Sequence, residues 1–266
     1  MTNVVGVVQV RMGSSRLPGK VMAAIEGHPM TWHIVNRLRH ARLLNNVVIA
    51  VADGQSDEPI RRMARDESIP YFAGSEADLI DRVYRTALEF HADAIVRITG
   101  DSPLVDPDVV DLLVKVYSDR SAELDYVSNG RPPTFPYGLN AEVYPTATLQ
   151  SLWHQIKDPL YREWFPVYVW EHEDAFRTYN VVHSEDLSHL RWTVDYDEDL
   201  SFVRQVYDRL YTEGKVFRMI DVLRLLASEP HLAKINAEHQ HRTEGNLKAT
   251  ATHPMTARTC EREIKR

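Results

Sequence analysis

The stretch VVGVVQV at residues 4–10, followed at once by RMGSSRLPGK at residues 11–20, decides how this chain folds. A short run of β-branched apolar residues is typical of a strand that is buried on both faces of a parallel sheet. The loop after such a strand lies at its carboxyl end, where open α/β sheets bind their ligands. We therefore expect a ligand-binding loop at residues 11–20.

Two kinds of group in this loop can hold an anion. The small residues Gly13, Ser14 and Ser15 let backbone N–H groups approach it closely. Positive charge comes from three side chains, which are Arg11, Arg16 and Lys20. We interpret the loop as one that grips a triphosphate. The alternative is a solvated loop with scattered basic residues, but such a loop needs no glycine, serine and cations packed before the pair Pro18-Gly19.

The composition is that of an ordinary globular protein and excludes several classes of function. The chain has 266 residues, of which 44% are hydrophobic and 26% charged. Its formal net charge of −7 argues against a general binder of nucleic acid or of anionic membranes. A basic loop inside an acidic chain fits a small anionic ligand better.

The cysteine count and the hydropathy pattern bear on the compartment. Cys260 is the single cysteine, so disulfide scaffolds and thiolate metal sites are excluded and a reducing cytosol is expected. The N-terminus lacks the pattern of a signal peptide, and no window approaches eighteen uninterrupted apolar residues. We expect a cytoplasmic protein without a membrane segment.

The first half of the chain alternates strands with helices. The pattern predicts strands at residues 4–10, 47–51, 69–72 and 94–98, and helices at about 29–42, 57–67, 76–91 and 107–117. Ser56 is the expected N-cap of the second helix. Repeated strand–helix units imply right-handed crossovers and a doubly wound, mostly parallel sheet.

The pattern changes after residue 120. We predict strands at residues 126–127, 141–144, 176–182 and 190–194, and helices at about 146–156, 160–173, 198–211 and 219–228. The last of these strands returns to the core. We therefore predict one domain over residues 1–235, followed by a polar, extended or disordered tail at 236–266. Within the domain, we predict a nucleotide half at residues 1–119, an inserted acceptor lobe at about 120–190, and the return to the core at 190–235.

Two acidic residues follow predicted strands. Asp101 comes after the strand at 94–98, behind Gly100, and Asp195 comes directly after the strand at 190–194. If both strands are central and parallel, both carboxylates face the first loop. Two hard oxygen ligands that leave other positions open suit Mg²⁺ bound to phosphate oxygens. The alternatives are that Asp101 only caps a turn or a helix, and that Asp195 or Asp197 only caps the helix that follows.

These residues carry a family resemblance. QVRMGSSRLPGK at residues 9–20 resembles the signature loop of the sugar cytidylyltransferases, which include the CMP-Kdo and CMP-sialic acid synthetases. The branch named after the spore-coat polysaccharide biosynthesis protein SpsF is more similar still. The matching segments are GSEADLIDR at 74–82, RITGDSPLVDP at 97–107, GLNAEV at 138–143 and TVDYDEDL at 193–200.

The resemblance implies a GT-A-like α/β fold and an enzyme that uses CTP with Mg²⁺. Such an enzyme joins CMP to a small acidic acceptor, releases pyrophosphate, serves the biosynthesis of surface polysaccharides or glycoconjugates, and forms a homodimer with the lobe at 120–190 as the candidate contact. Arg11, Arg16 and Lys20 would hold the triphosphate, and Asp101 and Asp195 would bind the metal.

The remaining implied contacts concern the nucleoside and the acceptor. The residues expected at the nucleotide, besides the loop residues Gly13, Ser14 and Ser15, are Val8, Gln9, Val10, Ser75, Arg82, Thr99 and Gly100. Asn140 and Glu142 would face the acceptor. The chain departs from the family at Asn140, where Asp is usual, and at Trp164, where His is usual. Both departures lie on the acceptor side.

Two other functions stay open at this point. A GT-A glycosyltransferase with a nucleotide-sugar donor would favour a short Asp-x-Asp motif after a strand, whereas residues 100–103 read Gly-Asp-Ser-Pro. A non-catalytic nucleotide-binding protein would not need Lys20, Asp101 and Asp195 together.

Several other residues invite weaker interpretations. The histidines near the C-terminus are expected on a solvated surface rather than at a metal, and they are His231, His239, His241 and His253. Trp153, Trp164 and Trp170 are expected in the core or an interface rather than as a stacking platform. Phe135 and Tyr137 can line either a sugar pocket or a dimer contact.

Overall fold

A computed structural model describes residues 2–239 of this chain. Residues 1 and 240–266 lie outside the described part, and with them Cys260, His241, His253 and most of the predicted polar tail. Within residues 2–239, no helix is long and apolar enough to cross a membrane.

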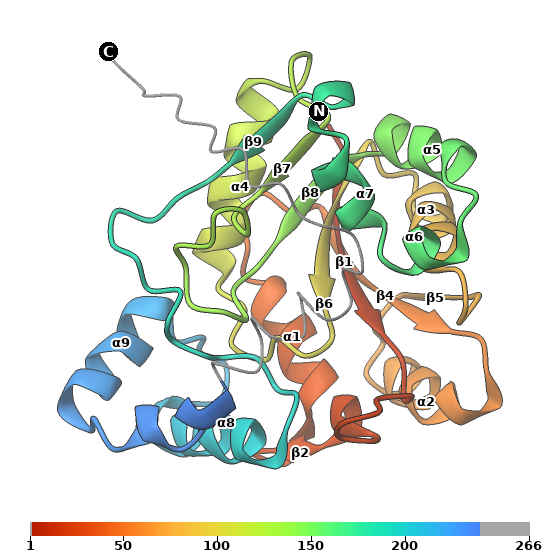
Figure 1. Ribbon diagram of the computed structural model, residues 1–266. Helices are drawn as coiled ribbons and strands as arrows, with labels where there is room; N and C mark the ends of the chain where they lie inside the picture. The colour runs from red at the N-terminus through yellow and green to blue at the C-terminus, as the bar shows by residue number, and fades with distance from the viewer. Residues whose placement is uncertain (1, 240–266) are drawn as a thin grey trace.

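A seven-stranded sheet forms the centre of the molecule, in the order β5-β4-β1-β6-β8-β7-β9 (Figure 1). The strands are β1 (Val4–Val10), β4 (Asn46–Ala52), β5 (Tyr71–Gly74), β6 (Ala94–Thr99), β7 (Tyr126–Ser128), β8 (Glu142–Pro145) and β9 (Thr178–Asn180). All neighbours are parallel except that β8 runs antiparallel to both β6 and β7. A separate hairpin pairs β2 (Ala24–Ile25) with β3 (His28–Pro29).

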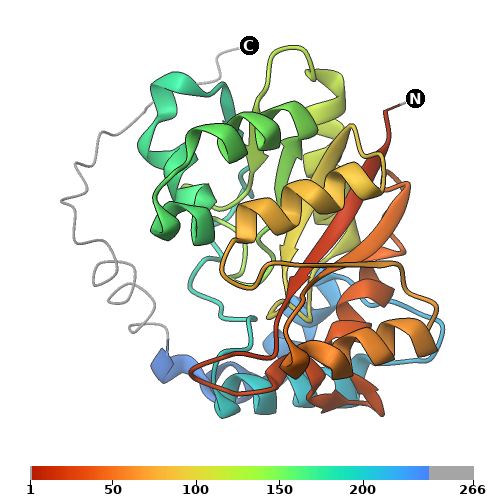
Figure 2. The ribbon, with the colours of Figure 1, turned by 90° about the vertical axis from the view of Figure 1, so that its right-hand side faces the viewer.

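Helices cover both faces of the sheet, because the side chains of β1 point alternately to the two faces and are buried on both. Val4, Val8 and Val10 pack into one core with α1, α2, α4, α8 and α9, whereas Val5 and Val7 pack into a second core with α3, α5 and α7. Figure 2 shows α3 and the helices α5–α7 on the same side of the sheet. This mostly parallel, doubly wound sheet confirms the predicted α/β fold.

The helices agree with the predicted positions to within a few residues. They are α1 (Met30–Leu38), α2 (Glu58–Asp66), α3 (Leu79–Glu89), α4 (Pro107–Asp119), α5 (Thr146–Gln155), α6 (Pro159–Glu163), α7 (Phe165–Glu171), α8 (Asp197–Leu210) and α9 (Met219–Ser228). Short 3₁₀ turns are η1 (Lys20–Met22), η2 (Gln55–Asp57), η3 (Glu173–Ala175), η4 (Leu232–Lys234) and η5 (Ala237–His239). The predicted helix at 160–173 is in fact two helices that meet at Trp164.

The predicted strand at 190–194 is wrong. This segment contains bends at Leu190 and Thr193 and makes an isolated bridge between Arg191 and Tyr137. Tyr137 brackets it with two backbone hydrogen bonds, because the Tyr137 N–H donates to Leu190 O at 2.8 Å and the Trp192 N–H donates to Tyr137 O at 2.7 Å. Gly138 permits this contact, since a Cβ there would lie 2.6 Å from Trp192 C, and its φ of +114° also favours glycine.

Two smaller predictions also differ from the structure. Ser56 is not the N-cap of α2, because it lies within η2 and Asp57 precedes the helix. The Asp57 side chain accepts a hydrogen bond from Met12 N at 2.6 Å, so it serves the first loop rather than its own helix. Residues 236–239 are not extended either, since η5 packs on the domain and both Asn236 and His239 are buried.

Candidate active site

The loop at residues 11–20 is held in a tight curl at the end of β1. The carbonyl oxygen of Met12 accepts hydrogen bonds from Ser14 N at 2.9 Å and Gly19 N at 3.2 Å. Gly19 adopts a φ of +73°, which costs glycine little, and the Ser14 hydroxyl accepts a hydrogen bond from Leu17 N at 3.3 Å. The curl brings Arg16 and Lys20 back toward the end of the sheet.

Lys20 lies at the centre of the site. Its Nζ donates hydrogen bonds to Val194 O at 2.6 Å and to Asp195 Oδ1 at 2.8 Å, and it lies 3.5 Å from Asp101 Oδ2. Asp101 follows β6 and Asp195 precedes α8, so Lys20 joins acidic residues from two distant parts of the chain. The structure therefore brings together the basic loop and both carboxylates predicted from the sequence, although the segment before Asp195 is not a strand.

Three cations surround the Asp195 carboxylate. Besides Lys20, Arg16 Nη2 lies 2.7 Å from Asp195 Oδ1, and Arg191 Nη2 lies 3.1 Å from Asp195 Oδ2. Burial alone would raise the pKa of Asp195, but the charges of Lys20, Arg16 and Arg191 outweigh it, so the pKa is lowered. Arg191 was not among the residues predicted for the site. The spacing of Arg191, Asp195 and Asp199 by four residues is the signal that could have revealed it.

Neither acidic residue is the N-cap of a helix, and Asp101 lies in the turn that follows β6. Asp199 Oδ2 accepts hydrogen bonds from the backbone N–H groups of Asp195 and Tyr196, at 2.9 and 3.1 Å, and so fixes the start of α8. The N-cap of α4 is Asp106. Asp101 instead accepts a hydrogen bond from the Thr99 hydroxyl at 2.6 Å, and its carboxylate stays partly exposed next to Lys20.

The residues of β1 that were predicted to contact the nucleotide are paired within the sheet. Val8 and Val10 are buried and lie in a strand that pairs on both edges, with β4 and β6. Gln9 O accepts a hydrogen bond from Gly100 N at 2.9 Å. A Cβ at Gly100 would lie 2.5 Å from Val10 Cγ1, so this glycine lets β6 end close against β1.

Ser75 and Arg82 form a second predicted nucleotide contact. Arg82 Nη1 donates to Ser75 O at 2.7 Å, while Arg82 Nε is buried without a hydrogen-bond partner among residues 2–239. Burial and the positive charge of Arg11 lower the pKa of Arg82 to about 10. Arg11 itself lies across from α6, with Nη2 3.2 Å from Glu163 Oε1. A buried, unpartnered donor facing a second cation suits an anionic or carbonyl-bearing ligand.

The two predicted acceptor residues lie in different surroundings. Glu142 is buried in an ion pair with Arg97 and also accepts a hydrogen bond from the Tyr126 hydroxyl at 2.7 Å. Arg97 Nε donates to Gln9 Oε1 at 2.7 Å, so Gln9 faces this ion pair through its side chain. Asn140 is only partly buried, and its Oδ1 accepts a hydrogen bond from Gly138 N at 3.3 Å. Glu142 is thus a buried structural partner, whereas Asn140 remains accessible.

The aromatic residues near the site separate into two groups. Phe135 packs in the core, and Trp153 and Trp170 are held by hydrogen bonds from their indole N–H groups to Asp81 and Tyr126. Tyr137 is partly exposed beside the site. Burial and the charges of Asp101 and Asp195 raise its pKa to about 12, so its hydroxyl stays protonated at neutral pH. Trp164 is exposed next to Glu163.

The donor set around Lys20 fits a divalent cation of the hard type. Asp101 and Asp195 direct carboxylate oxygens at one point, which the Lys20 ammonium approaches. Residues 2–239 contain no group of three or more His, Cys, Asp or Glu side chains arranged for a metal. Two protein carboxylates with the other positions left to water and phosphate oxygens is the arrangement that Mg²⁺ prefers.

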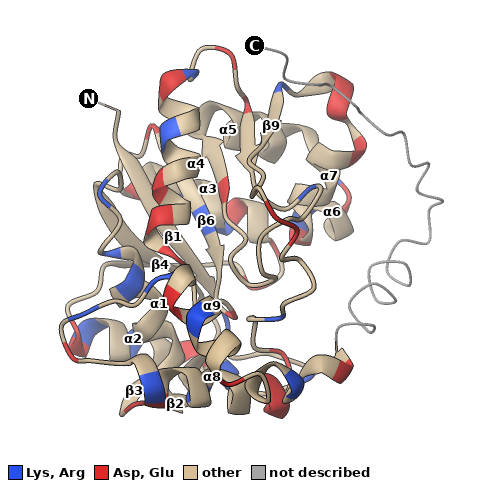
Figure 3. Cartoon of the chain, turned by 90° about the vertical axis from the view of Figure 1, so that its left-hand side faces the viewer, with Lys and Arg blue, Asp and Glu red and all other residues tan. Residues whose placement is uncertain are grey.

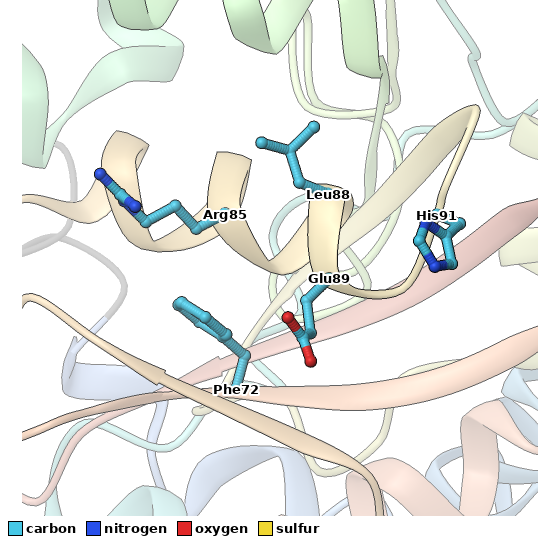
Figure 4. Close-up of a pocket in the computed structure, with 5 residues that line it drawn as sticks. All are labelled: Phe72, Arg85, Leu88, Glu89 and His91. Atoms are coloured by element: carbon cyan, nitrogen blue, oxygen red, sulfur yellow. The ribbon is translucent and has the colours of Figure 1, made fainter.

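Residues 2–239 also form open pockets away from these residues. A pocket between β5 and α3 is lined by Phe72, Arg85, Leu88, Glu89 and His91 (Figure 4). These five residues are all different from those predicted to form the site. Figure 3 shows that basic residues are mixed with acidic ones along the visible elements, so charge alone does not mark another site.

Fold, loop and paired acids together define a nucleotidyltransferase, and comparison with known proteins identifies the kind. The family model described as cytidylyltransferase matches residues 5–216, so this chain belongs to that family and is a CTP-dependent nucleotidyltransferase. This family membership excludes the glycosyltransferase alternative and confirms the resemblance seen in the sequence.

Individual relatives add detail. The spore coat polysaccharide biosynthesis protein SpsF of Bacillus subtilis is 27% identical over 216 residues, which are 79% of this chain and 88% of SpsF. The 3-deoxy-manno-octulosonate cytidylyltransferase of Lawsonia intracellularis is 34% identical over 128 residues, 46% of this chain and 49% of that protein. The solved structure of a cytidylyltransferase from Leptospira borgpetersenii matches with a TM-score of 0.84 and 27% identity, covering 88% of this chain and 97% of that one.

Proposed function

We propose that this cytidylyltransferase transfers CMP from CTP to an acidic sugar, with release of pyrophosphate, in the biosynthesis of a surface polysaccharide or glycoconjugate. The observation that carries the proposal is the convergence of Arg16, Lys20, Asp101 and Asp195 at the carboxyl end of the sheet. The names of the relatives support the class of acceptor, since one takes part in spore coat polysaccharide biosynthesis and another is a cytidylyltransferase for 3-deoxy-manno-octulosonate.

The basic loop would bind the triphosphate. Arg11 and Arg16 extend from it with partly exposed side chains, and Lys20 lies deeper, next to both carboxylates. Backbone N–H groups of Gly13 and Ser15 add uncharged donors at the same place. In the reaction, the oxygen of an acceptor hydroxyl bonds to the α-phosphorus and its proton passes to solvent, while the bond from that phosphorus to the pyrophosphate oxygen breaks. Lys20 and Arg16 would stabilise the negative charge that develops on the phosphate oxygens.

Asp101 and Asp195 would hold the divalent metal ion, and we propose Mg²⁺. When bound, the ion would neutralise phosphate oxygens and help to hold attack and departure in line. Thr99 orients Asp101 through its hydroxyl, and Arg191 orients Asp195 through Oδ2. Ser75 and Arg82, which are joined by a hydrogen bond near Arg11, would frame the nucleoside.

On the acceptor side, the geometry favours Asn140 and Tyr137 as contacts. Both are partly exposed at the loop that brackets residues 190–192. Glu142 would act only through Arg97, because the ion pair buries its carboxylate. The homodimer and the cytoplasmic location stay predictions from the sequence.

The test is release of pyrophosphate from CTP in the presence of Mg²⁺ and a panel of acidic sugars. Asp101→Asn should reduce turnover at least about a hundredfold, because it weakens the metal site and leaves the fold intact. Its melting temperature should stay close to that of the wild type, since Asp101 is partly exposed. Calorimetry should show tighter binding of CTP than of UTP or UDP-sugars. Full activity of Asp101→Asn would refute the metal assignment.

A further inference from the structure

The segment after α9 folds back against the loop that carries Asp195. Residues 229–239 contain η4 and η5, and within this segment Leu232 is fully buried in the core and Asn236 is buried beside the site. We call this segment the C-terminal clasp. The family model ends at residue 216, so the clasp lies beyond the matched part of the chain.

Asn236 connects the clasp to the residues that orient Asp195. Its Nδ2 donates one hydrogen bond to Arg191 O at 3.0 Å and another to Asp199 Oδ1 at 2.9 Å. Asp199 is fully buried, and its carboxylate also accepts hydrogen bonds from Arg191 and from the N–H of Asp195. Arg191 then contacts Asp195 Oδ2 at 3.1 Å. Asn236 therefore bonds to two of the residues that contact Asp195, namely Arg191 and Asp199.

The side-chain amide suits this position. Two oxygen acceptors face Asn236, and its NH₂ group supplies two donors without adding a charge. The buried Arg191–Asp199 pair is already balanced in charge. An aspartate at this position would repel Asp199, and an alanine would remove both hydrogen bonds.

His239 supports the same loop from the end of the clasp. Its ring stacks on Tyr196 with centroids 4.1 Å apart and planes at 11°, and its Nε2 lies 3.0 Å from Glu198 Oε2. The Arg16 guanidinium packs on the same tyrosine, 5.5 Å from the ring centroid. Tyr196 thus touches both the clasp and a cation of the triphosphate loop.

We propose that Asn236 is a positioning residue, through which the clasp fixes Asp195 for the metal and the triphosphate. The proposal rests on the proposed function, in which Asp195 binds the metal. Residues that orient a metal ligand commonly change metal affinity or activity by about 10- to 100-fold when they are removed. Asn236→Ala should therefore act on the metal-dependent part of CTP binding and leave the rest of the binding energy unchanged.

The first experiment needs neither metal nor nucleotide. Hydrogen exchange at the amides of Asp195 and Tyr196, which both donate to Asp199, should become at least about tenfold faster in Asn236→Ala. The amides of β1 serve as an internal reference. The control variant is Val114→Ala, which disturbs the same core from α4, outside the clasp, without touching the Arg191–Asp199 pair. It should lower the melting temperature without a selective effect at Asp195 and Tyr196.

The second experiment measures CTP binding by calorimetry with and without Mn²⁺. In the wild type and in Val114→Ala, Mn²⁺ should tighten CTP binding. Asn236→Ala should lose about tenfold or more of this gain while its affinity for metal-free CTP stays unchanged. An unchanged exchange rate, or an unchanged gain from Mn²⁺, would overturn the role of the clasp. If the wild type gains nothing from Mn²⁺, the metal assignment itself fails, and the exchange rates still decide whether Asn236 fixes the loop.

Discussion

Replacing Glu142 by glutamine separates a structural role of this residue from direct binding of the acceptor. In the structure, Glu142 and Arg97 form an ion pair with both side chains about nine-tenths buried. The charge of Glu142 keeps the pKa of Arg97 raised although burial opposes it. Glu142→Gln leaves the Arg97 cation buried without a counter-charge, which typically costs about 3–5 kcal/mol. The single amide oxygen of glutamine can still accept from Arg97, and its NH₂ group can donate to the Tyr126 hydroxyl oxygen, so we expect the lower end, about 3 kcal/mol.

This loss in the free energy of unfolding of Glu142→Gln is measurable by thermal and urea denaturation. For a domain of this size, each kcal/mol shifts the melting temperature by about 2–4 °C, so we expect a fall of about 6–12 °C. The double variant Arg97→Met/Glu142→Gln should recover most of it, since an apolar replacement removes the unpaired charge. Asp119→Asn is the matched control, because it breaks the exposed Lys115–Asp119 pair and should change the melting temperature little. A Glu142→Gln variant of normal stability with a greatly raised KM for the acceptor would refute this reasoning.

Three further predictions follow from other contacts. Lys20→Met should lower turnover about 10²–10³-fold, measured as pyrophosphate release, because the site loses the cation between Asp101 and Asp195. Burial lowers the pKa of His33 to about 4, so below about pH 6.5 the unfolded chain binds the proton that the folded protein excludes. The free energy of unfolding should therefore fall by about 3 kcal/mol between pH 6.5 and 4. Urea denaturation at a series of pH values should show a smaller fall over this range for His33→Gln. Gly138→Ala should destabilise the protein by more than about 1 kcal/mol and change the fluorescence of Trp192, because its Cβ would strike that residue's backbone. If Gly138→Ala had the stability and the tryptophan emission of the wild type, the close contact between Gly138 and Trp192 would be contradicted.

The first half of the fold could be predicted because its signals are local. The β-branched run at residues 4–10 is buried on both faces, and the loop after it contains every cation that we assigned to the triphosphate. The segment at 190–194 misled us because Arg191, Trp192, Thr193 and Val194 are all buried, as the residues of a central strand are. Such burial also occurs in this segment, which pairs through an isolated bridge to Tyr137. The conformation of residues 190–194 is set by the hydrogen bonds of Tyr137 and the close approach of Gly138, which lie more than fifty residues earlier in the sequence.

In the site too, the sequence indicates which residues matter but not which residues they contact. The sequence is enough to select Glu142 as a residue of interest, but not to pair it with Arg97, because that pairing depends on the antiparallel register of β6 and β8. It likewise selects Asp195 without Arg191, Asp199 or Asn236. Those three residues become neighbours only when α8 and the clasp pack on the end of the sheet.

Charge balance then explains how so many ionisable groups share one small site. Lys20, Arg16 and Arg191 surround Asp195, while Asp101 contacts Lys20 and Asp199 contacts Arg191. Three cations thus face three carboxylates, and the buried charges neutralise one another in the absence of a ligand. If a triphosphate draws Lys20 and Arg16 away from Asp195, Asp101 loses its cation and Asp195 keeps only Arg191 of its three. A divalent cation that enters with the nucleotide restores the balance, and this is the physical reason to expect metal and CTP to bind together.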